Sequence, residues 1–329
     1  MTTINVLAFD NCMVTGVAGP LEIFSIANNL FAQDEGRHSK KLFAGLNIVA
    51  IGGGDAVGFA GIAVAVSQDL SCVEPDILII PPVFGDLESL LDDEILIAQL
   101  SRLVSQGTII ATTCAGSFLL AQTGALSGKT ATTHWNLVAE FAERFPDIDL
   151  QARQMLIDGG NYICAGGAMA WQDLALHIVA RFMNKETASK CAKMLVMDST
   201  RHVQTPYFMF DQHAEGEAGF ADQKIAAVQK WMQENYSQSI QLEQLAGRYG
   251  SGVRTFLRRF KRATGLTPYN YLQQLRIEAA RHLLEVSAKN IEEITGLAGY
   301  ENASSFRRLF KRKTGLTPVE YRNKFRRFD

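Results

Sequence analysis

A chain of 329 residues with 47% hydrophobic and 20% charged side chains is long enough for two or three domains, and its composition excludes a disordered or fibrous protein. The formal net charge of −2 conceals an asymmetry, because residues 1–220 hold 24 acidic and 12 basic side chains whereas residues 221–329 hold 10 and 20. This distribution predicts that the C-terminal part of the chain binds a polyanion.

The first residues, MTTINVLAFD, lack the basic segment and long apolar stretch of a signal peptide, and no segment approaches 18 uninterrupted apolar residues. We therefore expect a cytoplasmic protein without a membrane partner. The five cysteines are widely spaced and form no C-x-x-C pair, which argues against a disulfide framework and against a zinc site.

From the N-terminus, short apolar runs alternate with helical patterns, a sequence of elements typical of an α/β layer structure with a mostly parallel sheet. The runs DILII and TIIAT (108–112) suit strands buried on both faces. A long helix is predicted over 168–183, and another helical stretch over 187–197. Periodicity is lost over 199–222, which we interpret as a linker. The expected division is an α/β domain at 1–198, the linker, and a helical domain at 223–329.

The helical part contains an internal repeat. RRFKRATGLTPYNY, beginning at Arg258, recurs fifty residues later as RLFKRKTGLTPVEY. Upstream apolar positions repeat with an offset of forty-nine, so one residue is inserted in the second turn. Gly265 and Gly315 are expected in the left-handed conformation at a helix end, and each Thr-Pro pair starts the next helix.

Each copy is predicted to form a helix, a tight turn and a second helix that is apolar on one face and rich in arginine on the other. Such a helix behind a short turn matches a recognition helix that enters the major groove of DNA. A basic face can also simply solvate an exposed helix, but two copies at the same spacing favour DNA binding.

On these residues, 223–325 resemble the DNA-binding domain of the AraC/XylS family, which has two helix-turn-helix units on a linking helix. The resemblance implies two recognition helices that read successive major grooves, about 34 Å apart. It assigns base-facing roles to Arg254, Leu257, Arg258, Ser304, Arg307 and Arg308. Contacts to phosphate are expected from Arg259, Lys261, Arg262, Lys311 and Arg312.

In the N-terminal part, the buried strand 109–112 runs directly into Cys114, Ala115 and a helix. A helix N-terminus favours a thiolate and offers backbone N–H groups to an anion. His134 lies twenty residues further on, so a Cys–His pair could form. The spacing alone also allows Cys114 to be a small buried apolar residue and His134 an ordinary polar one.

The segments TTCAGSFLLAQTGALSGKTATTHW, AFDNCMVTGVAGPLEIFSIAN and ICAGGAMAWQDLALHIV resemble the class I glutamine-amidotransferase-like superfamily, ThiJ/PfpI branch. The closest resemblance is to regulators of the GlxA type, which fuse this domain to an AraC-type one. The expected fold is α/β, with a flavodoxin-like, mostly parallel sheet flanked by helices, followed by an all-α domain. The resemblance places Cys114 and His134 in one pocket, with oxyanion donors from Ala115 and from the loop after Ile80.

Two departures argue against catalysis. The acidic residue that contacts the cysteine in enzyme members falls at Gly16, while Glu22 lies six residues later. The loop that often contains two glycines is Pro-Pro-Val-Phe-Gly here, and Pro82 has no N–H group. We expect an effector pocket lined by Glu22, Phe84, Cys114, Ala115, His134 and Trp135, with Trp171 as a further candidate aromatic wall.

Two hypotheses remain. The first is a transcription regulator, with activation as the family's commoner mode, that binds an operator and a small effector such as an amino acid or another nitrogenous metabolite. It would form a homodimer and, as an activator, contact RNA polymerase. The second is a Cys-dependent hydrolase, hydratase or glyoxalase-like enzyme with a DNA-binding appendage. We expect no metal and no cofactor, and no catalytic residues beyond the vestigial candidates Cys114 and His134.

Overall fold

The computed structural model describes residues 1–34, 42–210 and 222–326. The chain divides into two compact units, Met1–Gln204 and Thr205–Asp329. The expected linker at 199–222 overlaps both units, and its residues 211–221 lie outside the described part. None of the helices in the described ranges is long and apolar enough to cross a membrane.

The first unit is built on a seven-stranded sheet with the order β10-β11-β7-β6-β1-β2-β5. All neighbouring strands are parallel except the edge pair β10 and β11, which is antiparallel, so the expected mostly parallel α/β sheet is confirmed. The strands are β1 (Thr2–Leu7), β2 (Phe43–Ala50), β5 (Gln68–Asp69), β6 (Ile77–Ile80), β7 (Ile109–Thr113), β10 (Leu156–Asp158) and β11 (Tyr162–Ala165). Two small two-stranded sheets pair β3 (Ala56–Val57) with β4 (Ala63–Val64) and β8 (Thr130–Ala131) with β9 (Asp149–Leu150).

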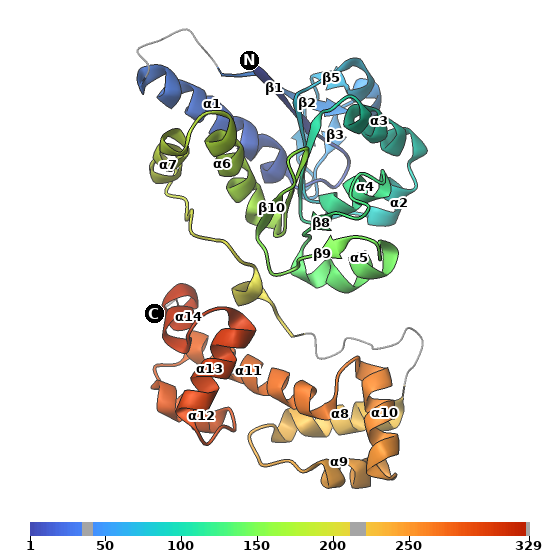
Figure 1. The fold of residues 1–329 in the computed structure, drawn as a ribbon, viewed down its shortest axis with the longest axis vertical. Coiled ribbons are helices and arrows are strands. Elements are labelled where there is room, and N and C mark those ends of the chain that lie inside the picture. The colour runs from blue at the N-terminus through green and yellow to red at the C-terminus, as the bar shows by residue number, and fades with distance from the viewer. Residues whose placement is uncertain (35–41, 211–221, 327–329) are drawn as a thin grey trace. The chain divides into compact units, whose positions relative to one another are not determined.

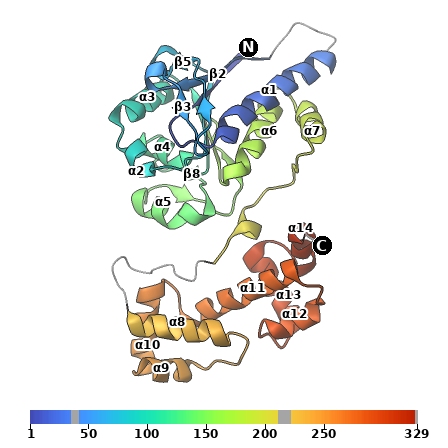
Figure 2. The same ribbon diagram turned by 180° about the vertical axis from the view of Figure 1, so that it is seen from behind.

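Helices cover both faces of the main sheet (Figures 1 and 2). One face carries α1 (Val14–Asp34), α6 (Trp171–Phe182) and α7 (Lys185–Met194), which pack on one another. The other face carries α2 (Leu87–Leu91), α3 (Glu94–Ser105), α4 (Gly116–Gln122) and α5 (Val138–Arg144). Every residue of β6 and β11 is buried, as expected for strands covered on both sides.

Two helix boundaries differ from the sequence prediction. The helix expected over 168–183 begins with a 3₁₀ turn at Ala168–Ala170 and becomes α-helical only at Trp171. The helix expected over 187–197 is α7, which starts at Lys185 because Asn184 caps it, with its side chain accepting the backbone N–H of Thr187. It ends at Met194.

The second unit consists of seven α-helices within its described residues, in addition to a 3₁₀ turn at Thr205–Tyr207. They are α8 (Gln223–Asn235), α9 (Leu242–Tyr249), α10 (Val253–Thr264), α11 (Pro268–Val286), α12 (Ile291–Leu297), α13 (Ala303–Thr314) and α14 (Pro318–Phe325). The long α11 joins two helical groups (Figure 1). Its Leu272 and Leu275 lie in the core formed with α8, α9 and α10, whereas Ile277 and Leu284 lie in the core formed with α12, α13 and α14.

The internal repeat is visible in the packing of these two cores. In the first, Phe256 contacts Phe260 with ring centroids 5.5 Å apart, and Phe260 contacts Tyr271 at 5.5 Å. In the second, Phe306, Phe310 and Tyr321 repeat this arrangement at 5.5 and 5.4 Å. The sequence repeat therefore encodes a repeated structure: two helix-turn-helix units with the same aromatic core.

Candidate functional site

The first helix-turn-helix unit is formed by α9 and α10. α9 ends at Gly250, whose φ of 81° lies in the left-handed region that glycine adopts without strain. After this short turn α10 begins at Val253, and its Phe256 and Phe260 are fully buried against the core. The helix ends where Gly265 takes a φ of 70°, as predicted.

Burial of this aromatic pair turns the basic side of α10 outward. Arg254, Arg258, Lys261 and Arg262 are exposed, while Leu257 and Arg259 are half-buried. Lys261 and Arg262 lie in the last turn, where positive charge also interacts favourably with the helix dipole.

The second helix-turn-helix unit consists of α12 and α13 and has the same arrangement, with one more residue in the turn between its helices. Asn302 caps α13 by accepting the backbone N–H of Ser305 at 2.8 Å, whereas Gly252, at the equivalent position before α10, has no side chain to do so. All the residues predicted on this face of α13 are exposed: Ser304, Arg307, Arg308, Lys311 and Arg312.

One predicted base-facing residue already forms an ion pair within the protein. Arg307 forms an ion pair with Glu292 of α12, with 2.5 Å between its Nη2 and the carboxylate Oε1. Both side chains are largely exposed, so water and salt weaken this pair. α10 and α13 therefore each present guanidinium groups that can bond guanine edges or phosphate. In the second helix-turn-helix unit, Glu292 competes for one of these groups.

Cys114 lies at a sharp turn between β7 and α4, as predicted. Its φ of 55° is in the left-handed region, which is unusual for a residue other than glycine. Its N–H donates to the carbonyl of Ala165 at 2.9 Å. Its own carbonyl accepts from the hydroxyls of Ser117 and Thr133, each at 3.0 Å, so the turn is held from three sides.

The protonation state of the Cys114 thiol differs from the one that the sequence predicts. Burial raises its pKa to about 11, and a hydrogen bond from the backbone of Ala115 offsets only part of this effect. The helix N-terminus was expected to favour the thiolate, but Cys114 is 7% exposed and the loss of hydration outweighs that contribution. At neutral pH the group is a thiol.

His134 is half-buried, and burial lowers the pKa of its imidazole. Its Nδ1 accepts the backbone N–H of Asn136 at 3.2 Å, and its ring lies against Trp135 with centroids 5.2 Å apart. In the part of the chain that the structure describes, no hydrogen bond joins His134 to Cys114. The Cys–His pair is therefore not formed in this conformation.

The remaining residues predicted for the effector pocket lie in different environments. Cys114 and Ala115 pack together with Val83 from the loop after β6. Phe84 is 45% exposed, and its ring lies 5.1 Å from that of Phe59. Glu22 is exposed on α1, and the structure does not bring it to the cysteine.

Trp171 is buried at the start of α6 and packs on α1 at Gly19, where an added Cβ would lie 2.4 Å from the indole ring. This position belongs to the contact between the two helices.

The surroundings of the thiol lack the features of an acyl-transfer site. A Cβ at Gly16, where an acidic residue would be needed, would lie 2.6 Å from Cδ of Pro82, so the backbone leaves no room for a side chain. The loop after Ile80 offers few oxyanion donors, because Pro81 and Pro82 lack N–H groups and the N–H of Phe84 is bonded to the carbonyl of Asn11 at 3.2 Å.

Three polar residues that the sequence did not single out are largely buried in the N-terminal unit, Met1–Gln204. Asp173 and Arg201 form an ion pair at 2.7 Å with side chains only 12% and 18% exposed, and Gln204 is 1% exposed. Arg201 and Gln204 fall in the aperiodic segment interpreted as a linker, which carried no signal for burial. Within the described residues, no group of three or more His, Cys, Asp or Glu side chains is arranged to hold a metal ion.

Comparison with known proteins agrees with both halves of this description. Residues 7–181, more than half of the chain, match the model of the DJ-1/PfpI family. The chain belongs to the DJ-1/PfpI family. In addition, residues 245–324 match the model of a helix-turn-helix domain, so a DJ-1/PfpI domain is followed by an AraC-type DNA-binding domain, as the sequence resemblance implied.

Among curated proteins, the DJ-1/PfpI chain is 26% identical over 304 residues to the HTH-type transcriptional regulator GbdR of Pseudomonas aeruginosa, covering 92% of this chain and 79% of GbdR. A ThiJ/PfpI family protein from Pseudomonas syringae has a similar fold, with a TM-score of 0.50 and 20% identity over 76% of this chain and 90% of that one. An AraC family transcriptional regulator from Pseudomonas putida matches with a TM-score of 0.50 and 15% identity, covering 59% of this chain and all of that one.

Proposed function

We propose that this protein is a transcription regulator that binds an operator through α10 and α13 and is controlled by a small metabolite bound in its DJ-1/PfpI domain. The observation that carries the proposal is the pair of helix-turn-helix units, each with a buried aromatic core and an exposed arginine-rich helix face. The relation to GbdR, which extends over most of both chains, supports it.

Within this proposal, the two helices divide their contacts between bases and phosphates. Arg254, Leu257 and Arg258 would face bases in the first major groove, and Ser304, Arg307 and Arg308 in the second. The lysines and arginines toward the end of each helix would contact phosphate and supply salt-dependent affinity without sequence preference: Arg259, Lys261, Arg262, Lys311 and Arg312.

The experiment is selection of binding sites from a pool of random duplexes with the full chain, followed by anisotropy titrations of the enriched duplex at several salt concentrations. We expect an enriched sequence with two elements about one helical turn apart, and affinity that falls steeply with salt. A pool that remains random after repeated selection, with binding equal for all duplexes, contradicts the proposal.

The second candidate function is a Cys114-dependent hydrolase, hydratase or glyoxalase-like activity. The position of Cys114 at a strained turn favours it, but the protonated thiol, the closed space at Gly16 and the scarcity of oxyanion donors argue against it. Turnover that Cys114→Ser abolishes while DNA binding persists would establish this activity.

The effector class and the mode of regulation extend the proposal. We expect a small nitrogenous metabolite such as an amino acid, a homodimer on the operator and, for activation, contact with RNA polymerase. A thermal-shift screen of metabolites on the full chain tests the effector, and light scattering with and without operator DNA tests the dimer.

A further inference from the structure

A cavity of about 350 Å³ lies in the first unit, and none of the residues predicted for the effector pocket lines it. Its walls come from residues 154–156 at the start of β10, from α6 and from residues 199–202. The volume is in the range of small-molecule sites. The third wall is notable because the second unit begins only three residues after it, at Thr205.

One charged group in this cavity has an unused donor. Arg201 pairs through Nη2 with Oδ2 of Asp173 at 2.7 Å, and the same nitrogen lies 3.1 Å from Oε1 of Gln172. Its Nε is buried and has no hydrogen-bond partner among the described residues. A buried donor without a partner is costly, and more so on a charged group. Because Nε is closed to solvent, an acceptor in the cavity would reach the guanidinium at Nη1, for which the described residues supply no hydrogen bond.

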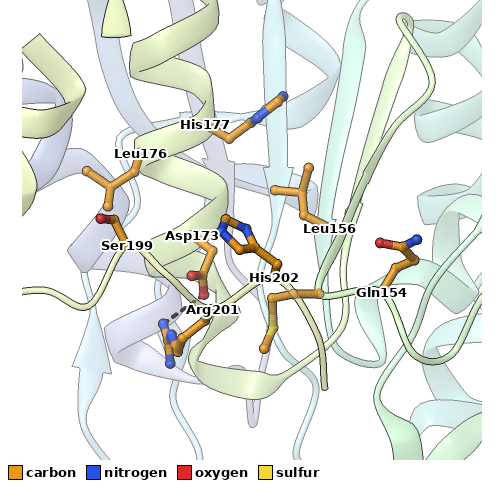
Figure 3. A pocket seen from close by; sticks show the side chains of 9 residues that line it. Gln154, Leu156, Asp173, Leu176, His177, Ser199, Arg201 and His202 are labelled. Carbon is orange, nitrogen blue, oxygen red and sulfur yellow. Dashed lines mark hydrogen bonds and ion pairs between the residues drawn. The ribbon is translucent and has the colours of Figure 1, made fainter. Parts of the chain in front are cut away.

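The rest of the lining indicates what carries that acceptor. Figure 3 shows Leu156 and Leu176 on opposite sides of the space, with Arg201 at its lower end and His202 between them. The carboxylate of Asp173 is already paired with the guanidinium. The cavity therefore offers one cationic donor and two leucine side chains within an otherwise mainly polar lining, which suit a small molecule with an anionic end and a short apolar body.

We propose that this cavity binds a small organic carboxylate, one oxygen of which accepts a hydrogen bond from Nη1 of Arg201 while its apolar part packs between Leu156 and Leu176. The planar guanidinium fork matches carboxylate geometry. The bound molecule would fasten residues 199–202 to β10 and α6.

Binding of the carboxylate does not depend on the proposed function, but the effect of this binding on DNA recognition rests on the proposed function. Residues 199–204 lead directly into the DNA-binding unit, so a ligand that orders this segment favours some placements of that unit over others.

The experiment uses the full chain and four probes of similar size or charge: butyrate, butylamine, 1-butanol and inorganic phosphate. Binding is followed by ligand-detected NMR, and ordering of the third wall by hydrogen exchange of peptides that cover 199–204. We expect butyrate to bind saturably and to slow exchange in this segment, and the other three to bind at least tenfold more weakly. Phosphate binding as tight as that of butyrate would show a general anion site and overturn the proposal, as would tighter binding of butylamine.

Three variants test the site. Arg201→Gln removes the guanidinium and its positive charge and should weaken butyrate binding at least tenfold. Leu156→Trp fills the space without touching the ion pair and should also weaken it, which keeps the test decisive if Arg201→Gln perturbs folding. Arg153→Gln is the matched control, because it removes the same charge from an exposed position that does not line the cavity. Butyrate affinity unchanged in both test variants, or lost in the control, would overturn the site.

The turn at Cys114 provides the second control. Cys114→Ser should leave butyrate binding unchanged, and loss of binding in this variant would place the ligand at that turn instead. Operator binding is measured on the same samples: butyrate binding without operator binding would support the cavity while contradicting the proposed function, and operator binding without butyrate binding would do the reverse.

Discussion

The side-chain amide of Gln204 donates to the backbone carbonyl of Thr133 at 2.9 Å. The same nitrogen lies 3.0 Å from the carbonyl of Gln154 and 3.2 Å from that of Ala152. Thr133 in turn donates its hydroxyl to the carbonyl of Cys114. The last residue of the first unit is thus linked through one intermediate residue to the strained turn at Cys114.

Replacing Gln204 by alanine should destabilise the first unit. The change leaves buried carbonyl groups without a donor and opens a void beside Gly166, so we expect a loss of about 2–4 kcal/mol. Hydrogen exchange of the full chain should show faster exchange both at 199–204 and around Cys114. The control is Gln151→Ala, an exposed glutamine on the same loop. Faster exchange at 199–204 alone would show that the link does not reach the turn.

The division of roles on the recognition helices predicts two kinds of DNA-binding defect. Arg258→Ala or Arg308→Ala should cost about 1–3 kcal/mol for the enriched operator and relax the preference at particular base pairs. Lys261→Ala or Lys311→Ala should weaken all duplexes alike and reduce the slope of affinity against salt by about one. Anisotropy titrations with the operator and a scrambled duplex measure both effects. Equal weakening of both duplexes by all four changes would mean that the base-facing positions are wrongly assigned.

The ion pair between Arg307 and Glu292 predicts that one substitution strengthens DNA binding. Glu292→Gln removes a negative charge from the DNA-binding face and releases the guanidinium, so affinity should rise a few-fold, most strongly at low salt. Glu243→Gln is the matched control, because Glu243 occupies the equivalent position in the first helix-turn-helix unit. The position equivalent to Arg307 there is the uncharged Leu257. If Glu243→Gln strengthens binding equally, general repulsion from the DNA explains the effect and the pair does not.

The sequence was most informative in the C-terminal part, where a repeat aligns two segments residue by residue. The repeated apolar positions indicate which faces of α10 and α13 are buried, so most of the exposed residues could be named in advance, although Leu257 and Arg259 are half-buried. The turn at Cys114 was also predictable, because a buried strand runs directly into a helix. The state of its thiol was not, since hydration depends on neighbours such as Val83 that are distant in the chain.

The missed residues have the same explanation. Gln204 bonds to a residue 71 positions away, and Arg201 to one 28 positions away, from a segment without periodicity. Local patterns report on amphipathic faces, and these two side chains are buried by contacts that no local pattern encodes.

The raised pKa of Cys114 predicts a slow thiol. With a pKa of about 11 in place of 9.0, its thiolate fraction at pH 7.5 is about a hundredfold lower than that of an ordinary cysteine, and burial slows access further. Iodoacetamide labelling followed by mass spectrometry should modify the exposed Cys72 first, and Cys114 only as the pH rises toward 11. A Cys72→Ser variant isolates the slow reaction. Rapid labelling of Cys114 near pH 7 would revive the enzymatic alternative.

Asp173 predicts a dependence of stability on pH. Burial raises the pKa of its carboxyl to about 6, with Arg201 opposing a larger rise. Because the folded-state pKa lies above the unfolded value of 3.8, this group's contribution to stability is complete below about pH 4 and is lost as the pH rises through 6. A shift of about two units corresponds to about 3 kcal/mol.

The ¹³C shift of the Asp173 carboxyl in the full chain measures this pKa directly. The stability of the N-terminal unit is measured by urea unfolding and followed by hydrogen exchange of protected peptides from that unit. In the wild type, its free energy of unfolding should fall between pH 4.5 and 7. Asp173→Asn should lose less over the same interval, because its amide does not titrate. An Asp173 pKa below 4 would show that the ion pair with Arg201 outweighs desolvation, and the difference between the two pH profiles would then change sign.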